Sequence, residues 1–250
     1  MSRMEFSLGK LFGKNKSYRR IIAIGDIHGF SAKLNALWSS LKVDHDKDLV
    51  VFLGDYTDRG PNSHDVMKFV LEHKDTPNIV FLKGNHEAMF YEAYKGDASG
   101  GSMTTWEING GKATMFSLYI NNGAGLIPEW CRMIERMPAS FSTEQDGKKF
   151  FFCHAGLNMR VPFEEQKEEY LLWDRDFVTR HTYSGERTVV VGHTPSIVIV
   201  PVYGDEPIKP QVLNDGKIIL MDTGAFLQGG SVSAMDVLTG KIWQSTRRKG

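Results

Sequence analysis

The sequence carries GDYTDRGP at residues 54–61, directly after the apolar run LVVFL at residues 49–53. An apolar run of this length, bounded by glycine, predicts a buried strand. Asp55, Asp58 and Arg59 would then lie just beyond its carboxyl end, the edge at which open α/β sheets bind ligands. The glycines on either side allow the backbone to turn tightly and to approach a ligand closely.

The same arrangement occurs once before and once after this stretch. The run IIAI at residues 21–24 leads into GDIHG at residues 25–29, and IVFL at residues 79–82 leads into KGNHE at residues 83–87. Three apolar strands, each followed by Asp, His or Asn, predict one site that is assembled from three loops.

Helical periodicity fills the gaps between these strands. The expected helices, with an N-cap residue where one is evident, cover 31–41 (Ser31), 62–73 (Asn62 or Ser63) and 87–95. Residues 20–95 therefore predict a βαβαβα unit, which is typical of a parallel sheet with right-handed crossovers.

Beyond residue 95 the pattern changes twice. Glycines between 96 and 111 predict loops, and helices are expected over 112–120 and after Pro128, so residues 96–138 should form a mainly helical insertion. From residue 139 β-structure is expected again. The predicted elements are a hairpin at 139–144 and 149–153, a helix at 164–177, strands at 188–191 and 217–221, and a closing hairpin at 231–236 and 241–244.

The composition is that of a globular protein and disfavours several classes. Among 250 residues, Lys+Arg and Asp+Glu are 30 each, so the basic excess of a nucleic-acid binder is missing and no nucleic-acid partner is expected. No apolar run approaches the ~18–20 residues of a membrane span, so no stable membrane insertion is expected. Two cysteines, Cys131 and Cys153, indicate reduced thiols in a cytoplasmic protein. Residues 1–19 should form a loose basic tail before a single domain over 20–250.

Candidate metal ligands follow five of the predicted strands. They combine carboxylate and amide oxygens with imidazole nitrogens, which suits Mn, Fe or Zn better than Ca or Mg. The residues are Asp26, His28, Asp55, Asn85, His86, His154 and His193. One metal could take Asp26, His28 and Asp55. A second could share Asp55 and add Asn85, His154 and His193, because a shared carboxylate offsets the repulsion between two cations.

Each of these residues, taken alone, has a simpler explanation. A lone Asp-x-His after a strand is often an ordinary loop, and His154 or His193 alone would more often be a hydrogen-bonded loop histidine than a metal ligand. Five apolar strands that all end in such residues are rarely a coincidence, so we favour a metal site over five unrelated loops.

Three of these segments resemble the signature motifs of the phosphoprotein phosphatase family of metallophosphoesterases. The segments are GDIHG at 25–29, GDYTDRG at 54–60 and GNHE at 84–87, in the family's order and with its spacing. WDRD at 173–176 and DTGA at 222–225 look like the short bacterial and phage-type branch. The resemblance covers about residues 20–240 and implies an α/β fold (α+β) with four layers, an α/β/β/α sandwich.

The resemblance also implies a role for each matched residue. The metal ligands would be Asp26, His28, Asp55, Asn85, His154 and His193. His86 would be the general acid, oriented by Asp58. Arg59 and Arg175 would bind the substrate phosphate, together with Asn85. The cofactor would be two divalent metal ions, first of all Mn²⁺, with Fe or Zn as alternatives.

The implied activity is hydrolysis of phosphoserine and phosphothreonine in proteins, and of other phosphomonoesters, by in-line attack of a hydroxide that bridges the two metals. Phosphorylated proteins or peptides are the expected partners, and no regulatory subunit is evident. The first alternative is a hydrolase of dinucleoside polyphosphates or nucleotides on the same scaffold. The second is a non-catalytic binding protein, which the presence of every matched residue disfavours.

Overall fold

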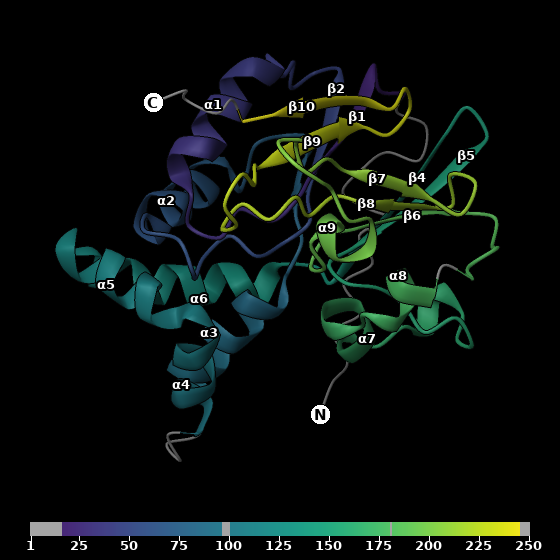
Figure 1. Ribbon diagram of the computed structural model, residues 1–250. Helices are drawn as coiled ribbons and strands as arrows, with labels where there is room; N and C mark the ends of the chain where they lie inside the picture. Colours follow the sequence, from purple (N-terminus) through teal and green to yellow (C-terminus); the bar gives the residue numbers. More distant parts are fainter. Residues whose placement is uncertain (1–16, 97–100, 181, 246–250) are drawn as a thin grey trace.

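Two five-stranded β-sheets pack face to face, and helices cover the outer face of each (Figure 1). The computed structural model describes residues 17–96, 101–180 and 182–245. The predicted α/β/β/α layering is confirmed. Within these ranges no helix has both the length and the apolar character needed to span a membrane. Cys131 and Cys153 are free and buried.

The first sheet is built around the three strands predicted at the start of the chain. β1 (Arg20–Ile24), β2 (Asp48–Phe52) and β3 (Ile79–Phe81) lie side by side and run parallel. The C-terminal hairpin of β9 (Ser233–Asp236) and β10 (Lys241–Gln244) pairs antiparallel with β1. These strands confirm the predictions, and the last strands of the chain thus adjoin the first.

The second sheet comes from the later half of the chain. It contains, in spatial order, β4 (Ser140–Gln145), β5 (Lys148–Cys153), β6 (Thr188–Val191), β8 (Ile218–Leu220) and β7 (Gln211–Leu213). β5, β6 and β8 are parallel, and β4 and β7 form antiparallel edges. The predicted hairpin and strands are confirmed. The short strand β7 was not predicted, because three residues are too few to show a period.

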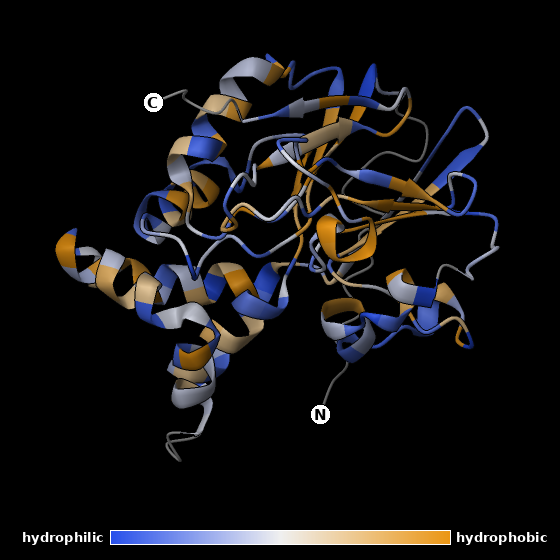
Figure 2. Cartoon of the chain, in the orientation of Figure 1, coloured by the Kyte–Doolittle hydropathy of each residue, from blue (hydrophilic) through white to orange (hydrophobic). Residues whose placement is uncertain are grey.

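Alternation of side chains along the strands creates three apolar layers between the four layers of backbone. In β1, Ile22 and Ile24 pack against the helices, whereas Ile21 and Ala23 pack against the second sheet. The second sheet repeats this pattern, and Phe151 of β5 faces the helices on its own outer side. Figure 2 shows the central strands as predominantly hydrophobic. Strands that are buried on both faces read as continuous apolar runs, which is why they could be located from sequence.

Helices α1 (Ser31–Leu41) and α2 (Ser63–His73) connect the parallel strands of the first sheet, and α3 (Asn85–Lys95) follows β3, as predicted. The prediction that Ser31 caps α1 is wrong, because Phe30 occupies the N-cap position and makes no side-chain capping bond. Ser31 is the first helical residue instead.

Residues 101–136 form a run of helices beside the first sheet. The elements are α4 (Gly101–Trp106), a π-helix (Glu107–Gly111), α5 (Lys112–Ile120), a 3₁₀-helix (Gly123–Leu126) and α6 (Ile127–Arg136). The expectation of loops up to residue 111 is wrong over the described part, 101–111. Its glycines serve close packing: a Cβ on Gly111 would lie 2.4 Å from the ring of Trp106, and Gly110 forms a kink with φ of 113°.

The helix predicted over 164–177 is broken into shorter pieces. They are a 3₁₀-helix (Phe163–Glu165), α7 (Glu168–Trp173) and α8 (Asp176–Arg180). Asp174 causes the break, because its Oδ1 accepts the N–H of Phe177 at 2.7 Å and so begins a new helix. The short helix α9 (Ser196–Ile199) was not predicted.

Tyr18 anchors the start of the described chain. It is buried, its N–H donates to Oε1 of Gln145 at 2.7 Å, and its carbonyl accepts from Nε2 of the same side chain at 2.7 Å. Most of the predicted basic tail, residues 1–16, lies outside the described residues. The domain boundary at residue 20 stays a prediction, but the packing of the chain against the core already includes Tyr18.

Asp48 at the start of β2 is fully buried and is held by Arg19 and Arg20. Burial alone would raise the pKa of Asp48, but hydrogen bonds from both guanidinium groups outweigh it and hold the pKa well below its usual range. A depressed folded-state pKa contributes stability that is present above the unfolded value of about 3.9 and is lost as the pH falls through the folded value.

We therefore expect Asp48→Asn to lower the free energy of unfolding by about 2–3 kcal/mol at pH 7, since it removes one partner of a buried ion pair. The difference between the variant and the natural chain should shrink at pH 3. Urea unfolding at both pH values measures this. A difference that stays the same at pH 3 would show that the charge of Asp48 is not the cause.

Candidate active site

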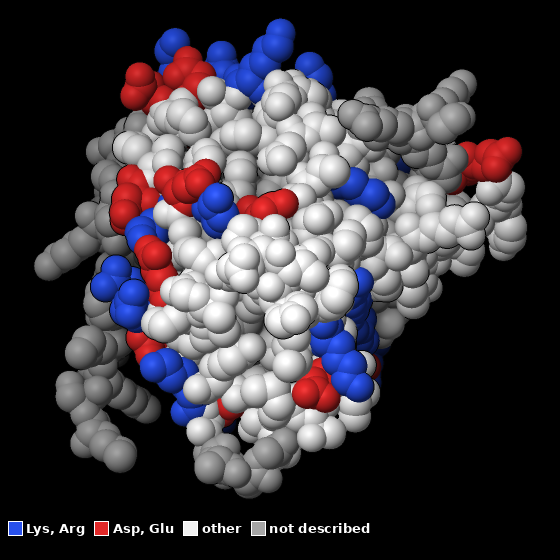
Figure 3. Space-filling view, turned by 90° about the vertical axis from the view of Figure 1, so that its left-hand side faces the viewer, with Lys and Arg blue, Asp and Glu red and all other residues white. Residues whose placement is uncertain are grey.

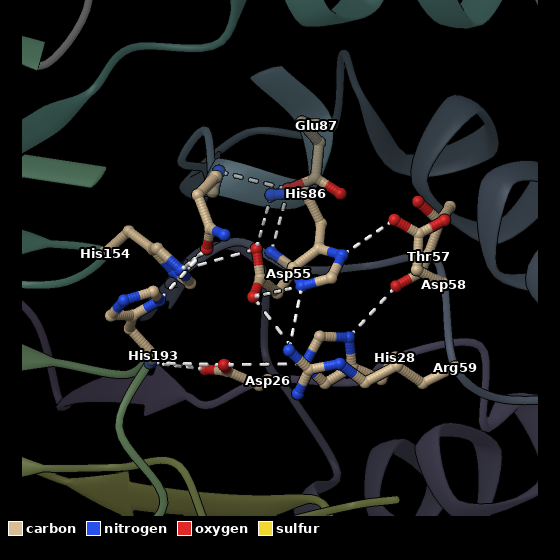
Figure 4. A network of polar contacts seen from close by, with 12 residues as sticks. Asp26, His28, Asp55, Thr57, Asp58, Arg59, His86, Glu87, His154 and His193 are labelled. Atoms are coloured by element: carbon tan, nitrogen blue, oxygen red, sulfur yellow. Dashed lines mark hydrogen bonds and ion pairs between the residues drawn. The ribbon is translucent and has the colours of Figure 1, made fainter. Parts of the chain in front are cut away.

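The carboxyl ends of five strands meet in one place, which Figure 4 shows from close by. The residues brought together there are Asp26 and His28 after β1, Asp55 after β2, Asn85 and His86 after β3, His154 after β5 and His193 after β6. Each of them is at most 7% exposed. Every metal-ligand candidate of the sequence is therefore part of one buried cluster.

Asp55 lies at the centre of this cluster. Its Oδ2 is 3.6 Å from Nε2 of His28, and its Oδ1 is 3.3 Å from Nε2 of His154. The ligand atoms form two groups, each within 4.8 Å: one of His28, Asp55 and His86, the other of Asp55, His154 and His193. Asp55 is the member common to both, so its two oxygens face two separate positions.

Asp26 and Asn85 complete the two groups. The Asp26 carboxylate accepts the backbone N–H of His193 at 3.1 Å, and its Oδ2 is 4.0 Å from Nε2 of His28. Oδ1 of Asn85 lies 2.9 Å from Nε2 of His154 and 3.0 Å from Nδ1 of His193. The amide oxygen of Asn85 and the carboxylates of Asp26 and Asp55 thus lie among the imidazole nitrogens of the histidines.

Backbone carbonyls orient two of the histidines. Nδ1 of His28 lies 3.0 Å from the carbonyl oxygen of Thr57, and Nδ1 of His154 lies 2.8 Å from that of Leu53. A carbonyl only accepts, so each Nδ1 carries the hydrogen and donates it. In the neutral ring this places the lone pair on Nε2, which is directed into the cluster, and histidine ligands of metals adopt the same arrangement.

His86 and Asp58 form a hydrogen-bonded pair at the edge of the cluster. Nδ1 of His86 is 2.7 Å from Oδ2 of Asp58. Nε2 of His86 faces the cluster, 3.0 Å from Nη2 of Arg59 and 3.9 Å from Oδ2 of Asp55. The carboxylate fixes the ring, and the other nitrogen is directed to where a substrate would bind.

Two residues of the helical segment support this pair and a third holds the backbone of Arg59, and sequence reasoning gave none of them a role. Trp106 donates its Nε1–H to both oxygens of Asp58, at 2.9 and 3.0 Å, and Thr114 donates its hydroxyl to Oδ1 at 2.7 Å. The carbonyl of Gly110 accepts the N–H of Arg59 at 3.1 Å.

Trp106→Phe is expected to lower kcat by about tenfold, within the 10–100-fold range typical of residues that orient catalytic groups. Phenylalanine fills most of the same space but donates no hydrogen bond, so Asp58 would orient His86 less firmly. Steady-state kinetics and elemental analysis should show a lower kcat with unchanged metal content. An unaltered kcat would mean that Thr114 alone fixes Asp58.

Two further buried carboxylates border the site. Glu87 accepts the N–H groups of Asp55, Tyr56 and Gly84 at 2.8 to 3.0 Å, and it thereby shapes the turn that carries Asp55. Burial and the charge of Asp55 raise the pKa of Glu87 to about 7. Asp222 accepts the N–H of Gly224 with one oxygen, and burial raises its pKa to about 6. Both lie in motifs that the sequence singled out.

Burial and nearby carboxylates shift the pKa values of the site histidines in opposite directions. Burial lowers the pKa of His28 well below the ordinary value and the pKa of His193 to about 2, and in each case a neighbouring histidine adds to the effect. Burial also lowers the pKa of His86, but the carboxylates of Asp55 and Asp58 outweigh it and raise that pKa. His28 and His193 are therefore neutral donors of a lone pair. Burial opposes the charge of His154 as well, but the carboxylates of Asp55 and Asp26 outweigh it and raise the pKa of His154 to about 9.

Several site residues adopt a left-handed backbone, which side chains other than glycine rarely do. The φ angles are 48° at His28, 55° at Asp55, 71° at Asp58, 65° at Arg59 and 61° at His193. Such conformations cost free energy and persist where the surrounding structure enforces them. The strained backbone conformations therefore occur at the residues of the candidate metal site.

Arg175 reaches the site from the connection between α7 and α8. Its Nη1 donates to the hydroxyl of Thr194 at 3.0 Å and to the carbonyl of His193 at 3.3 Å. The guanidinium group thus lies next to His193, one of the candidate ligands.

The cluster fits two divalent cations. Two carboxylates and several lone pairs are buried together, and they leave negative charge that a bound cation would neutralise. Mixed oxygen and nitrogen donors are the ligands of Mn, Fe and Zn. One position would be held by Asp26, His28 and Asp55, and the other by Asp55, Asn85, His154 and His193, as expected from the sequence.

Residues 19–224 match the family model described as calcineurin-like phosphoesterase. The chain belongs to this family. It is a metallophosphoesterase, a hydrolase of a family that uses divalent metal ions.

Relatives of this phosphoesterase carry two kinds of name. Serine/threonine-protein phosphatase 2 of Salmonella typhimurium is 26% identical over 220 residues, which cover 85% of this chain and 90% of that protein. The symmetrical bis(5'-nucleosyl)-tetraphosphatase of Neisseria gonorrhoeae is 29% identical over 172 residues, 59% of each chain. A protein serine/threonine phosphatase structure from Saccharomyces cerevisiae shares the fold, with a TM-score of 0.58, 17% identity and coverage of 92% of this chain and 81% of that one.

Proposed function

We propose that this phosphoesterase hydrolyses phosphoserine and phosphothreonine in proteins, and other phosphomonoesters as well. The observation that carries the proposal is the 2.7 Å hydrogen bond between His86 and Asp58 at the edge of the metal-ligand cluster. The alkoxide of serine or threonine is a poor leaving group and needs a proton as the ester bond breaks. Asp58 holds the ring through Nδ1, and a protonated His86 would supply that proton from Nε2, the nitrogen that faces the cluster.

Two divalent metal ions, most readily Mn²⁺, would be bound by six side chains, and His86 would act beside them as the general acid. The six ligands are Asp26, His28, Asp55, Asn85, His154 and His193. When bound, such ions neutralise the phosphate and make hydroxide available near neutral pH. The protein residues supply the geometry: Asp55 serves both positions, and the carbonyls of Thr57 and Leu53 keep His28 and His154 in the tautomer that presents Nε2.

Arg59 and Arg175 would bind the phosphate oxygens, with Asn85 beside them. A phosphomonoester dianion repels an anionic nucleophile, so positive charge on the substrate side lowers the barrier. The planar guanidinium group donates two parallel hydrogen bonds, which match two phosphate oxygens. Arg59 lies beside His86 and Arg175 beside His193, so the two guanidinium groups would fix the orientation of the phosphate for in-line attack.

A hydrolase of dinucleoside polyphosphates on the same scaffold is the second candidate, and the name of the Neisseria relative favours it. Coverage does not separate the two substrates, because relatives of both names match most of this chain. The hydrogen-bonded pair of His86 and Asp58 favours the protein substrate, whose alkoxide leaving group needs a proton. Parallel assays with a phosphothreonine peptide and diadenosine tetraphosphate separate the two. We expect a higher kcat/KM for the peptide, and a preference for the dinucleotide by tenfold or more would reverse the assignment.

Metal dependence tests whether the chain is a catalyst at all. Removal of metal with a chelator should abolish hydrolysis of p-nitrophenyl phosphate, and Mn²⁺ should restore it. A chain that stays inactive with Mn²⁺, Fe²⁺ and Zn²⁺ would instead be a binding protein.

We further place the protein in the cytoplasm, with phosphorylated proteins or peptides as partners and without a dedicated regulatory subunit. The free thiols of Cys131 and Cys153 support a reducing compartment. On the face shown in Figure 3, positive and negative side chains are interspersed around an uncharged area.

A further inference from the structure

The side chain of Arg59 rests on an aromatic ring from a distant part of the chain. The guanidinium carbon lies 4.3 Å from the ring centroid of Phe226, within the range of a cation–π interaction. The same ring meets His28 edge-on, with centroids 5.2 Å apart and an interplanar angle of 83°. Phe226 thus lies between the proposed phosphate-binding arginine and one candidate metal ligand.

Arg59 needs such support because its side chain is exposed, although the residues around it are buried. Its backbone is fixed at a φ of 65° and by the hydrogen bond to Gly110. A long side chain beyond a fixed backbone still loses rotamer freedom when it binds a ligand. A ring that holds the guanidinium group in advance reduces this loss, since preorganisation increases affinity.

The loop that carries Phe226 is itself held in place. Within the loop, Leu227 donates its N–H to the carbonyl of Gly224 at 2.8 Å. Lys33 of α1 donates its ammonium group to the carbonyl of Ala225 at 2.6 Å and to that of Gly230 at 2.8 Å. Lys33 therefore anchors both ends of the loop to α1, and these hydrogen bonds help to fix the position of the Phe226 ring.

We propose that Phe226 is a positioning residue for Arg59 and that Lys33 keeps the Phe226 loop in place for this purpose. The proposal rests on the proposed function, because it takes Arg59 as a phosphate ligand. Phe226 acts on substrate affinity through the arginine, and loss of its ring weakens the binding of any phosphate group at the site.

The test compares Phe226→Leu, which keeps an apolar side chain, with Phe226→Trp, which keeps an aromatic ring. We expect Phe226→Leu to raise the inhibition constant of inorganic phosphate and the KM for p-nitrophenyl phosphate about three- to fivefold, the effect of an exposed cation–π contact. kcat should change less than KM, and elemental analysis should show unchanged metal content. Phe226→Trp should stay within about twofold of the natural chain.

The same substitutions in an Arg59→Ala background decide whether the ring acts through the arginine. There, Phe226→Leu should cause no further loss of phosphate affinity. An equal loss in both backgrounds would overturn the proposal, as would an effect of Phe226→Trp as large as that of Phe226→Leu. Unchanged phosphate affinity in Arg59→Ala alone would instead overturn the phosphate-binding assignment of Arg59.

Lys33→Met tests the tie on the loop, with Lys68→Met as the matched control, because Lys68 is exposed on α2. Lys33→Met should raise the inhibition constant of phosphate about twofold or more, and Lys68→Met should not. An inhibition constant that stays the same in Lys33→Met would show that the loop holds Phe226 without the lysine.

Discussion

Asp55→Asn should lower kcat by on the order of 10³-fold or more and reduce the content of both metals at once. Asp55 is the residue common to both groups of ligand atoms, with Oδ1 3.3 Å from His154 and Oδ2 3.6 Å from His28. The variant keeps the shape of the side chain but loses its charge and one acceptor. Several kcal/mol of transition-state stabilisation depend on the metals, and each 1.36 kcal/mol is tenfold in rate.

Elemental analysis after gel filtration measures this directly. Asp58→Asn is the matched control, because Asp58 has the same chemistry and burial but bonds His86 and Trp106 and belongs to neither ligand group. The control should keep its metal while losing activity. Full metal content in Asp55→Asn would contradict a bridging role for this carboxylate.

His86→Asn should reduce hydrolysis of a phosphoserine peptide by about 10²–10⁴-fold, the usual contribution of a general acid. Hydrolysis of p-nitrophenyl phosphate should fall much less, because nitrophenolate leaves without a proton. The expectation follows from the geometry of His86, whose Nδ1 is bonded to Asp58 at 2.7 Å while Nε2 faces the cluster.

The ratio of the two rate losses is the informative quantity. Asp58→Asn should show the same preference for the good leaving group, since it acts on the same imidazole. Equal losses on both substrates would remove His86 from the role of acid and leave it as a structural neighbour of Asp55.

Much of the site could be predicted from sequence because its residues follow buried strands. A strand covered on both faces is a continuous apolar run, so the positions of Asp26, Asp55 and His193 at strand ends were evident. Parallel strands bring their carboxyl ends to one edge, and the topology then determined the cluster.

The support of Asp58 could not be predicted in the same way. Trp106 and Thr114 lie 48 and 56 residues further along the chain, and no local period connects them with Asp58. The glycines around Trp106 suggested loops, although in the structure they allow close packing within helices. Phe226 was missed for a similar reason, because its contact with Arg59 depends on how two distant loops meet.

The order of strands in the first sheet has a consequence for how the enzyme is made. β1 acquires its neighbour β9 only after residues 233–236 have been synthesised. His193 and Phe226 must also leave the ribosome before Asp26 and Arg59 have their partners. A nascent chain therefore lacks part of the catalytic centre until β6, His193 and Phe226 have emerged, and the first sheet alone does not complete it.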